Sequence, residues 1–295
     1  MSVLATIQWG GRREAHRARS EALLAGVVER RSTGSKHPVE DFLFDYYSLR
    51  PGELMRWHPG VGVVLDDPEG VYAGQKFYRH AEGVSSVDVD GFLARRGPTV
   101  DFARRLLVTT ATNPAHFGCF GMHEWAMVYH LQPDQTRHSY LPLRFSPERV
   151  AEITEQVGVR CSHFDAFRFF TPDAQPLNEI PGHDGTPTRE RQPELDQGGC
   201  LHTNMDLYKW AGKLLPLVDS ELLLDCFELS RDIRELDMRA SAYDLGEWGY
   251  EPVQVEAPAG RAQYVRMQRE FADRGAALRQ RLLTVLDAVK TGPAI

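Results

Sequence analysis

Three segments of the chain each place a histidine near an acidic residue and a cysteine, and side chains of these types transfer protons or bind metals. The segments are GCFGMHEWAM, RCSHFDAFRFF and GCLHTNMDLYKW. Their histidine and carboxylate residues are His123 and Glu124, His163 and Asp165, and His202 and Asp206. A carboxylate near an imidazole can orient the ring or stabilise its charged form, so each pair is a candidate for acid–base catalysis.

The segment RCSHFDAFRFF is predicted to be a β-strand, because it is rich in aromatic residues and ends at Thr171-Pro172. Alternate side chains of a strand face the same side, so Cys161, His163 and Asp165 would share one face. Neither face is purely apolar, which favours a functional role over ordinary core packing. The alternative is that each histidine is a buried, hydrogen-bonded structural residue and each cysteine a small apolar one.

A metal site is one interpretation of these segments. His163 and Asp165, followed by His202, match the two-histidine, one-carboxylate ligand set of non-haem iron enzymes, and His123 is a further candidate ligand. The cofactor would then be Fe(II) or Zn(II). The usual jelly-roll scaffold of such oxygenases is not expected, because few strands are visible and the chain after His202 is predicted to be helical. The Cys-x-x-Cys spacing typical of zinc sites is also missing.

Other residues are candidates for binding a substrate. Residues 171–199 are polar and show little periodicity, which predicts a long loop that could cover the site, with Arg189 as a contact. Tyr46 and Arg50 combine an aromatic ring with a positive charge, a pairing that can stack on a base or hold a phosphate. Asp206 is a further candidate contact. The alternative is that the loop is a solvated surface segment and that Tyr46 and Arg50 form the edge of an amphipathic helix.

The composition is that of an ordinary globular protein. The 295 residues are 42% hydrophobic and 25% charged, which allows a sizeable core and argues against wholesale disorder. With a net charge of -7, the chain is not basic overall as most nucleic-acid-binding proteins are, although a local basic patch could exist. Four dispersed cysteines, no signal-peptide pattern and no long apolar run predict a cytoplasmic protein with reduced thiols and no membrane segment.

The hydrophobic periodicity predicts a predominantly α-helical α+β fold with a small β component, in a single domain spanning residues 1–295. Helices are expected at 12–31, from Pro38, at 88–96, at 99–111, after Ser146, from Thr203 to Leu215, after Asp219 and at about 260–290. Ser146 and Asp219 are predicted helix caps, and Gly97-Pro98 is predicted to separate two helices. Residues 60–67 are predicted to form a strand, whereas 118–131 fit either a helix or a buried strand.

Several stretches taken together resemble one known protein family. They are KHPVEDFLFDYYSLRP, GCFGMHEWAMVY, CSHFDAFRFFTPDAQPLN, GCLHTNMDLYKWAGKL and DIRELDMRASAYDL, and the resemblance covers nearly the whole chain. The family is an actinobacterial one whose members commonly carry the label 3-methyladenine DNA glycosylase. The resemblance implies an N-glycosylase, a hydrolase that cleaves an N-glycosidic bond, and it supplies no catalytic residues.

Hydrolysis of an N-glycosidic bond requires a carboxylate near the sugar and an aromatic pocket for the base. Glu124 or Asp165 would be the general base, with His163 as its orienting partner, and Trp125 and Phe167 would contact the base. No cofactor is required by this hypothesis. The negative net charge disfavours duplex DNA as the substrate and favours a nucleoside or another small molecule.

Three classes of function are open at this point. The leading hypothesis is an N-glycosylase acting on an alkylated base in DNA or on a nucleoside-like small molecule. The second is a metal-dependent enzyme acting on a small molecule, such as an oxygenase. The third is a non-catalytic binding protein, in which the long loop at 171–199 and the aromatic, basic residues near Tyr46 form the contact surface.

Overall fold

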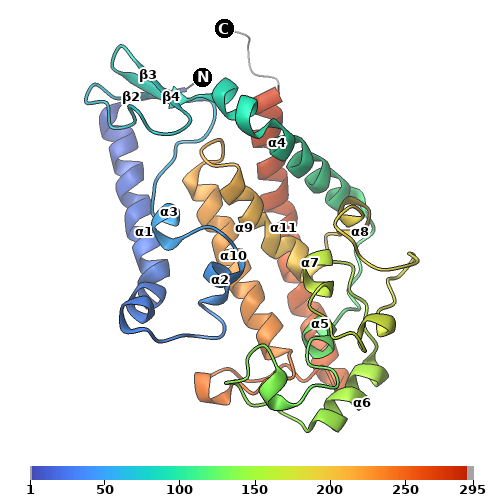
Figure 1. The fold of residues 1–295 in the computed structure, drawn as a ribbon. Coiled ribbons are helices and arrows are strands. Elements are labelled where there is room, and N and C mark those ends of the chain that lie inside the picture. Colours follow the sequence, from blue (N-terminus) through green and yellow to red (C-terminus); the bar gives the residue numbers. More distant parts are fainter. Residues whose placement is uncertain (1, 291–295) are drawn as a thin grey trace.

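The computed structural model describes residues 2–290 (Figure 1). Its helices are α1 (Thr6–Thr33), α2 (Phe42–Tyr46), α3 (Pro51–Leu54), α4 (Val89–Thr112), α5 (Met122–Ala126), α6 (Pro147–Val157), α7 (Phe164–Phe167), α8 (Gln192–Leu195), α9 (Leu201–Lys213), α10 (Ser220–Arg239) and α11 (Pro258–Lys290). Short 3-10 helices are η1 (Pro133–Gln135), η2 (Gln175–Leu177) and η3 (Gly246–Trp248), and the strands are β1 (Ser2–Leu4), β2 (Val63–Asp66), β3 (Tyr78–Ala81) and β4 (Val84–Val87). The predominantly helical α+β fold expected from the sequence is confirmed. No helix in this described range has the combination of length and hydrophobicity that crossing a membrane requires.

The strands form one small sheet at the end of the molecule where α1 and α4 begin (Figure 1). Their order is β1-β2-β4-β3, in which β1 pairs with β2 in parallel and the other pairs are antiparallel. The expected strand at 60–67 is confirmed as β2. The sheet packs on α1 through a satellite core formed by Trp9, Trp57, Leu65 and Tyr72.

The long helices α9, α10 and α11 lie at the centre of the molecule, and α4 runs along one side of them (Figure 1). α9 packs against α10 and α11, and α4 packs against α11. On α10, Leu222, Leu229 and Leu236 recur on one face and are buried, which is the helical pattern predicted from the sequence. Asp219 caps this helix, because its Oδ1 accepts the backbone N–H of Leu222 at 2.8 Å. Ser146 caps α6 in the same way.

The predicted break at Gly97-Pro98 is wrong, because α4 continues through Pro98. A proline inside a helix costs about 3 kcal/mol. Phe92 before the proline and Val100 and Ala103 after it are all buried, so packing of both halves of the helix outweighs that cost. The helix expected from Pro38 is also wrong in extent, since residues 38–41 form turns and α2 begins only at Phe42.

The strand predicted for RCSHFDAFRFF is wrong as well. His163 has an extended backbone, but Phe164–Phe167 form the single-turn helix α7. Cys161, His163 and Asp165 therefore do not share the face of a strand. The aromatic residues serve the core instead, where the rings of Phe167 and Phe170 lie 5.1 Å apart. An aromatic run of this length can be buried from a short helix as well as from a strand, so its composition alone misleads.

The described cysteines are free thiols, and Cys161, Cys200 and Cys226 are buried. Burial raises the pKa of the Cys200 thiol to about 12. It also raises the pKa of Cys161, well above the value of an exposed thiol. These cysteines therefore act as neutral, small apolar side chains near neutral pH, as the structural interpretation of the sequence allowed.

Acid is expected to destabilise the fold through His58, which is buried beside Tyr78, with Nδ1 2.8 Å from the Tyr78 hydroxyl. Burial lowers the pKa of His58 to about 4, whereas an unfolded histidine titrates near 6.5. Between these values the unfolded chain binds a proton that the folded chain does not, so stability falls as the pH is lowered through this window. The loss is about 3 kcal/mol by pH 4.

Urea unfolding of the wild type and of His58→Gln at pH 7 and at pH 4.5 tests this expectation. The difference in unfolding free energy between the two pH values is expected to be smaller in the variant, because the titrating imidazole is gone. Other acid-sensitive groups are common to both proteins and cancel in the comparison. Equal pH dependence in the two proteins would show that His58 does not make this contribution.

Candidate functional site

The three histidine segments, which are far apart in the sequence, meet in one buried cluster. The rings of His123 and His202 have centroids 4.5 Å apart and cross at 83°. The rings of His163 and His202 are stacked, with centroids 5.5 Å apart. All three side chains are buried. The structure thus brings together the imidazoles that the sequence singled out.

Short and central helices position these rings. His123 lies in α5, His163 immediately precedes α7, and His202 lies in the first turn of α9. The helix expected from Thr203 therefore begins slightly earlier, and its first turn carries His202 into the cluster. α5 starts at Gly121, whose φ of 71° is accessible to glycine at little cost. A Cβ at Gly121 would lie 3.3 Å from the Cβ of Ala240, so glycine also permits the close approach of α5 to the end of α10.

His123 faces Asp237, a buried residue of α10. His123 Nε2 lies 2.7 Å from Asp237 Oδ1 in a buried ion pair, although the direction of the contact is not that of a regular hydrogen bond. Arg234 holds Asp237 Oδ2 at 3.2 Å and also binds Glu124 at 2.8 Å. Burial opposes a charge on His123, but the Asp237 carboxylate outweighs burial and raises the pKa of His123. Burial likewise opposes the charge on Asp237, and His123 outweighs it and lowers the pKa of Asp237.

His123, His202 and Asp237 have the geometry of a metal-binding group. One ligand atom from each residue lies within 4.8 Å of the other two. Two imidazoles and one carboxylate are ligands that suit Zn(II) and Fe(II). Burial, followed by the charge of His123, lowers the pKa of His202 well below its usual value, so this ring is neutral and can donate a lone pair. We refer to these three residues as the His-His-Asp group.

His163, Asp165 and Asp206 form a second cluster with similar spacing, but its charge is already balanced. Lys209 Nζ lies 2.7 Å from Asp206 Oδ2 and 3.1 Å from Asp165 Oδ2. Burial opposes the charge on Asp165, but Lys209 outweighs it and lowers the pKa of Asp165. The Lys209 ammonium contacts both carboxylates of this cluster and occupies the place of a cation, whereas Arg234 contacts only Oδ2 of Asp237 and leaves Oδ1 to face His123. The geometry therefore favours the His-His-Asp group over the predicted ligand set of His163, Asp165 and His202.

His163 has a different partner, which fixes the orientation of its ring. Its Nδ1 lies 3.0 Å from Asp196 Oδ1, and both side chains are almost fully buried. Its Nε2 lies 3.8 Å from Asp206 Oδ2 and has no hydrogen-bond partner within residues 2–290. Burial opposes a charge on His163, and Asp196 outweighs it and raises the pKa of His163. An aspartate on Nδ1 with a free Nε2 is the arrangement of a histidine acid–base catalyst.

A small cavity, the carboxylate cavity, adjoins the cluster. It is lined by His202, by the charged side chains of Glu124, Asp165, Arg137 and Arg234, by His138, by Met127 and Ala166, and by the aromatic rings of Phe42, Tyr46, Phe169 and Tyr243. Its volume is about 20 Å³, which is room for about one water molecule. Both predicted general bases, Glu124 and Asp165, thus face one space, and each is paired with a cation.

Comparison with known protein families, with curated proteins and with solved structures found no match for this chain. The His-His-Asp group and the carboxylate cavity therefore carry the functional argument. The His-His-Asp group is built from α5, α9 and α10, and the carboxylate cavity adds side chains from α2 and α7.

Some predicted substrate contacts lie at the cavity. Tyr46 lines it, and its hydroxyl has no hydrogen-bond partner among the described residues. Arg189, from the long loop at 171–199, reaches Asp165 Oδ1 at 3.1 Å. Asp206 is buried behind the cavity, where it accepts a hydrogen bond from the Tyr47 hydroxyl at 2.8 Å. The loop therefore supplies a side chain to the site, as expected of a covering segment.

Other predicted contacts are placed elsewhere. Trp125 is fully buried in the hydrophobic core, and its indole N–H donates to the backbone carbonyl of Ala240 at 2.9 Å. Phe167 is also a core residue, and its neighbour Phe169 lines the cavity in its place. Arg50 is exposed at the start of α3 and does not line the cavity. Asp165 and Phe167 both belong to the helical turn α7, in which side chains two residues apart point in different directions.

Asp237, Arg234, Asp196 and Lys209 were not among the predicted site residues. The pattern of α10 carries a signal for Asp237, because Cys226, Ser230, Ile233 and Asp237 recur at helical spacing and are all buried. An aspartate on the buried face of a helix requires a partner. No comparable local signal marks Asp196, which lies in an irregular segment after α8.

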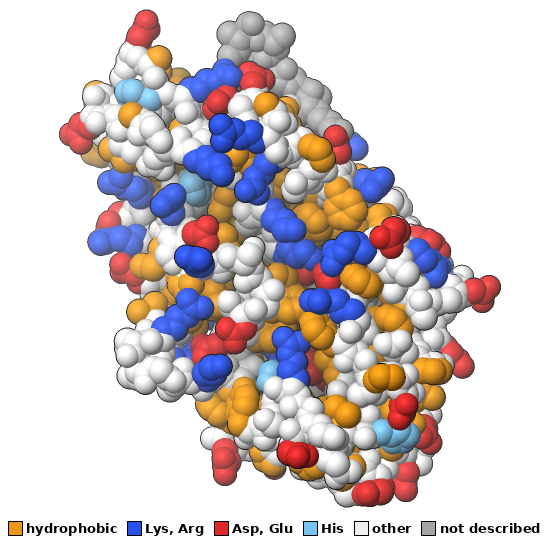
Figure 2. Space-filling model, in the orientation of Figure 1, with side chains coloured by type: hydrophobic (Ala, Val, Ile, Leu, Met, Phe, Trp, Pro, Cys, Tyr) orange, Lys and Arg blue, Asp and Glu red, His pale blue; other side chains and the backbone are white. Residues whose placement is uncertain are grey.

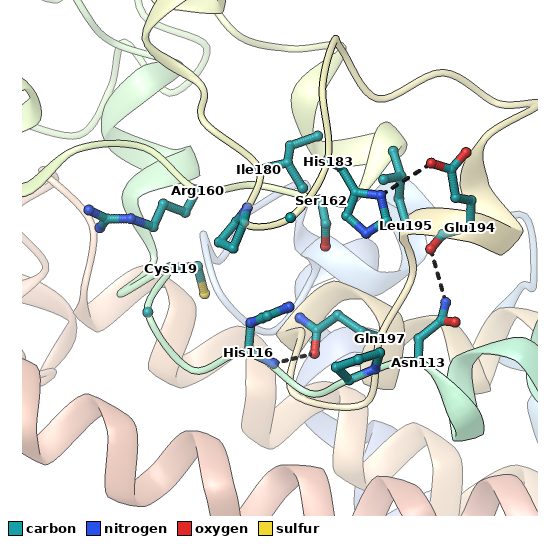
Figure 3. A pocket seen from close by; sticks show the side chains of 14 residues that line it. Asn113, His116, Cys119, Arg160, Ser162, Ile180, His183, Glu194, Leu195 and Gln197 are labelled. Atoms are coloured by element: carbon teal, nitrogen blue, oxygen red, sulfur yellow. Dashed lines mark hydrogen bonds and ion pairs between the residues drawn. The ribbon is translucent and has the colours of Figure 1, made fainter.

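A larger pocket of about 360 Å³ lies near the site (Figure 3). Its walls come from the loop after α4 and from the segment that ends in α8, which are joined by hydrogen bonds from the backbone N–H of His116 to Gln197 at 2.9 Å and from Asn113 to the carbonyl of Glu194 at 3.0 Å. Ser162 and Gln197 line it, and they are the chain neighbours of His163 and Asp196. A pocket of this volume can hold a small organic molecule.

Proposed function

We propose that the protein is a metal-dependent hydrolase in which His123, His202 and Asp237 hold the metal. One observation carries the proposal: one ligand atom each of His123, His202 and Asp237 lies within 4.8 Å of the other two, and all three side chains are buried. A metal ion bound there would take the place of the proton that otherwise charges His123 in its ion pair with Asp237. Three protein ligands leave coordination positions open, as in catalytic zinc sites.

The side chains around the metal site have defined tasks in this proposal. Zn(II) or Fe(II) would supply a Lewis acid that lowers the pKa of a bound water molecule. Arg234 fixes the orientation of the Asp237 carboxylate through its contact with Oδ2. His163, held by Asp196 through Nδ1, would accept or return a proton at Nε2. Glu124 and Asp165 keep the cavity polar and, with their cations, would orient the one water molecule that it has room for.

Metal analysis tests the proposal directly. We expect purified protein, dialysed against Zn(II) or Fe(II) and then against metal-free buffer, to retain about one metal ion per chain, because three ligands give tight binding. The melting temperature is expected to rise on metal addition and to fall with a chelator. Protein that retains no zinc, iron or manganese, and whose melting temperature does not respond to any of them, would exclude this function.

Hydrolysis of an N-glycosidic bond without a metal is the second candidate. It is favoured by one observation: Glu124 and Asp165 line the same cavity as the rings of Phe42, Tyr46 and Phe169. Such a reaction uses a carboxylate beside an aromatic pocket, and the cavity would have to widen from about 20 Å³ to admit a base. Release of a base from nucleosides or alkylated DNA, measured with a chelator present, separates the two candidates. The second candidate is supported if the base is released in the presence of the chelator by the wild type but not by Asp165→Asn. It is excluded if no base is released from either substrate.

A further inference from the structure

We propose that a pocket between α3, α4 and α9 binds a phosphate group. This pocket, called here the anion pocket, has a volume of about 160 Å³, enough for a phosphate with some of its hydration water. The residues that concern the proposal are Arg96 of α4, Glu53 of α3, and Tyr208, Lys209 and Lys213 of α9. No step of the proposed hydrolysis uses it, so the inference stands apart from that function.

Two side chains bring uncompensated positive charge to the anion pocket. Lys209 is neutralised by Asp165 and Asp206, but within residues 2–290 neither Arg96 nor Lys213 has a carboxylate at ion-pair distance. The Lys213 ammonium lies 5.1 Å from the centre of the Trp210 ring, which holds it near the pocket. Guanidinium and ammonium groups without protein anions are the donors that bind phosphate.

A buried donor faces the same pocket. Tyr208 is fully buried, and its hydroxyl has no hydrogen-bond partner among the described residues. Burial, and then the charge of Glu53, raises the pKa of Tyr208. Tyr208 and Glu53 both line the pocket, and the effect of the Glu53 charge on Tyr208 shows that the two side chains lie near each other. An unpaired buried hydroxyl is unfavourable, and a phosphate oxygen would accept its hydrogen bond.

Glu53 is the one group in the pocket that opposes an anion. Its carboxylate is exposed, and its Oε2 accepts the backbone N–H of Arg50 at 2.9 Å, which disperses part of its charge. The positive charges of Arg96 and Lys213 together exceed the single negative charge of Glu53. Figure 2 shows that Lys and Arg side chains gather on this face over α4 and α9, although the net charge of the chain is -7. The local field therefore attracts anions.

The anion pocket lies next to the carboxylate cavity, and Lys209 connects the two. Lys209 lines the anion pocket, and its ammonium binds Asp165, which lines the carboxylate cavity. A phosphate in the pocket would lie one side chain away from that cavity. The phosphate could belong to a small phosphorylated molecule or to the backbone of a nucleic acid, since both present the same tetrahedral anion.

The test measures binding of inorganic phosphate to the full chain by calorimetry, at constant ionic strength and with chloride as the reference anion. Lys213→Gln and Tyr208→Phe are each expected to weaken binding about tenfold, because each removes one hydrogen-bond donor to a charged group. Tyr208→Phe removes only an oxygen that has no partner, so folding is preserved. Glu53→Gln is expected to tighten binding, and Arg266→Gln, an exposed change of equal charge on α11, to leave it unchanged.

Further arms identify the source of the phosphate. A nucleoside monophosphate and a single-stranded oligonucleotide are titrated against the same variants, and the ligand whose affinity depends most on Tyr208 and Lys213 is the better match. Chelated protein is used throughout, so a failure of the metal proposal does not affect the result. No phosphate binding, or equal binding in the wild type, Tyr208→Phe and Lys213→Gln, would overturn the proposal.

Discussion

Replacing Arg234 with methionine is expected to lower the free energy of unfolding by about 3–5 kcal/mol. Arg234 is 1% exposed, and its guanidinium binds Glu124 and Asp237 while it lies 3.7 Å from the centre of the Phe42 ring. Methionine retains much of the side-chain volume but leaves two buried carboxylates without their cation. Urea unfolding followed by circular dichroism measures the loss.

Two further variants make this measurement specific. Arg231→Met, on the same helix with a side chain that is 42% exposed, is expected to change the unfolding free energy by no more than about 0.5 kcal/mol. Adding Glu124→Gln to Arg234→Met is expected to recover part of the loss, because a neutral amide needs no counter-charge. Similar losses in Arg234→Met and Arg231→Met would show that the buried ion pairs do not stabilise the fold.

Asp237→Asn and His202→Ala are each expected to weaken metal binding by more than about 100-fold, because even residues that only orient a ligand change affinity by 10–100-fold. Asparagine keeps the shape of the aspartate but loses its charge, and alanine removes one imidazole from the His-His-Asp group. Equilibrium dialysis with Zn(II), followed by elemental analysis of the folded fraction, gives the affinity. Any hydrolytic activity of the wild type is expected to disappear with the metal.

The matched controls are Asp206→Asn and His138→Asn. Asp206 belongs to the cluster that Lys209 already neutralises, and His138 lines the carboxylate cavity outside the ligand group. Both variants are expected to keep the metal of the wild type. Loss of metal in Asp206→Asn together with retention in Asp237→Asn would move the metal to the His163 cluster, against the assignment made here.

The sequence predicted the long helices well because their signals are local. A helix cap requires one side chain and a backbone N–H three residues away, and both Ser146 and Asp219 cap helices as expected. The buried face of α10 likewise follows from its own periodicity. The local errors have two causes: at Pro98 the packing of α4 against α11 outweighs the intrinsic preference of proline, whereas the aromatic residues of RCSHFDAFRFF can be buried from a helical turn as well as from a strand.

For the candidate site, too, some features could be predicted from the sequence and others depend on the tertiary structure. The sequence by itself identified the three histidines, because an imidazole beside a carboxylate is a recognisable chemical pattern, and it determined the helical class of the fold. Only the tertiary structure decided which carboxylate each ring meets: Asp237 for His123 and Asp196 for His163. It also decided that Lys209 neutralises Asp165 and Asp206. These pairings depend on how α5, α9 and α10 pack, and helix packing is set by surfaces that are distant in the chain.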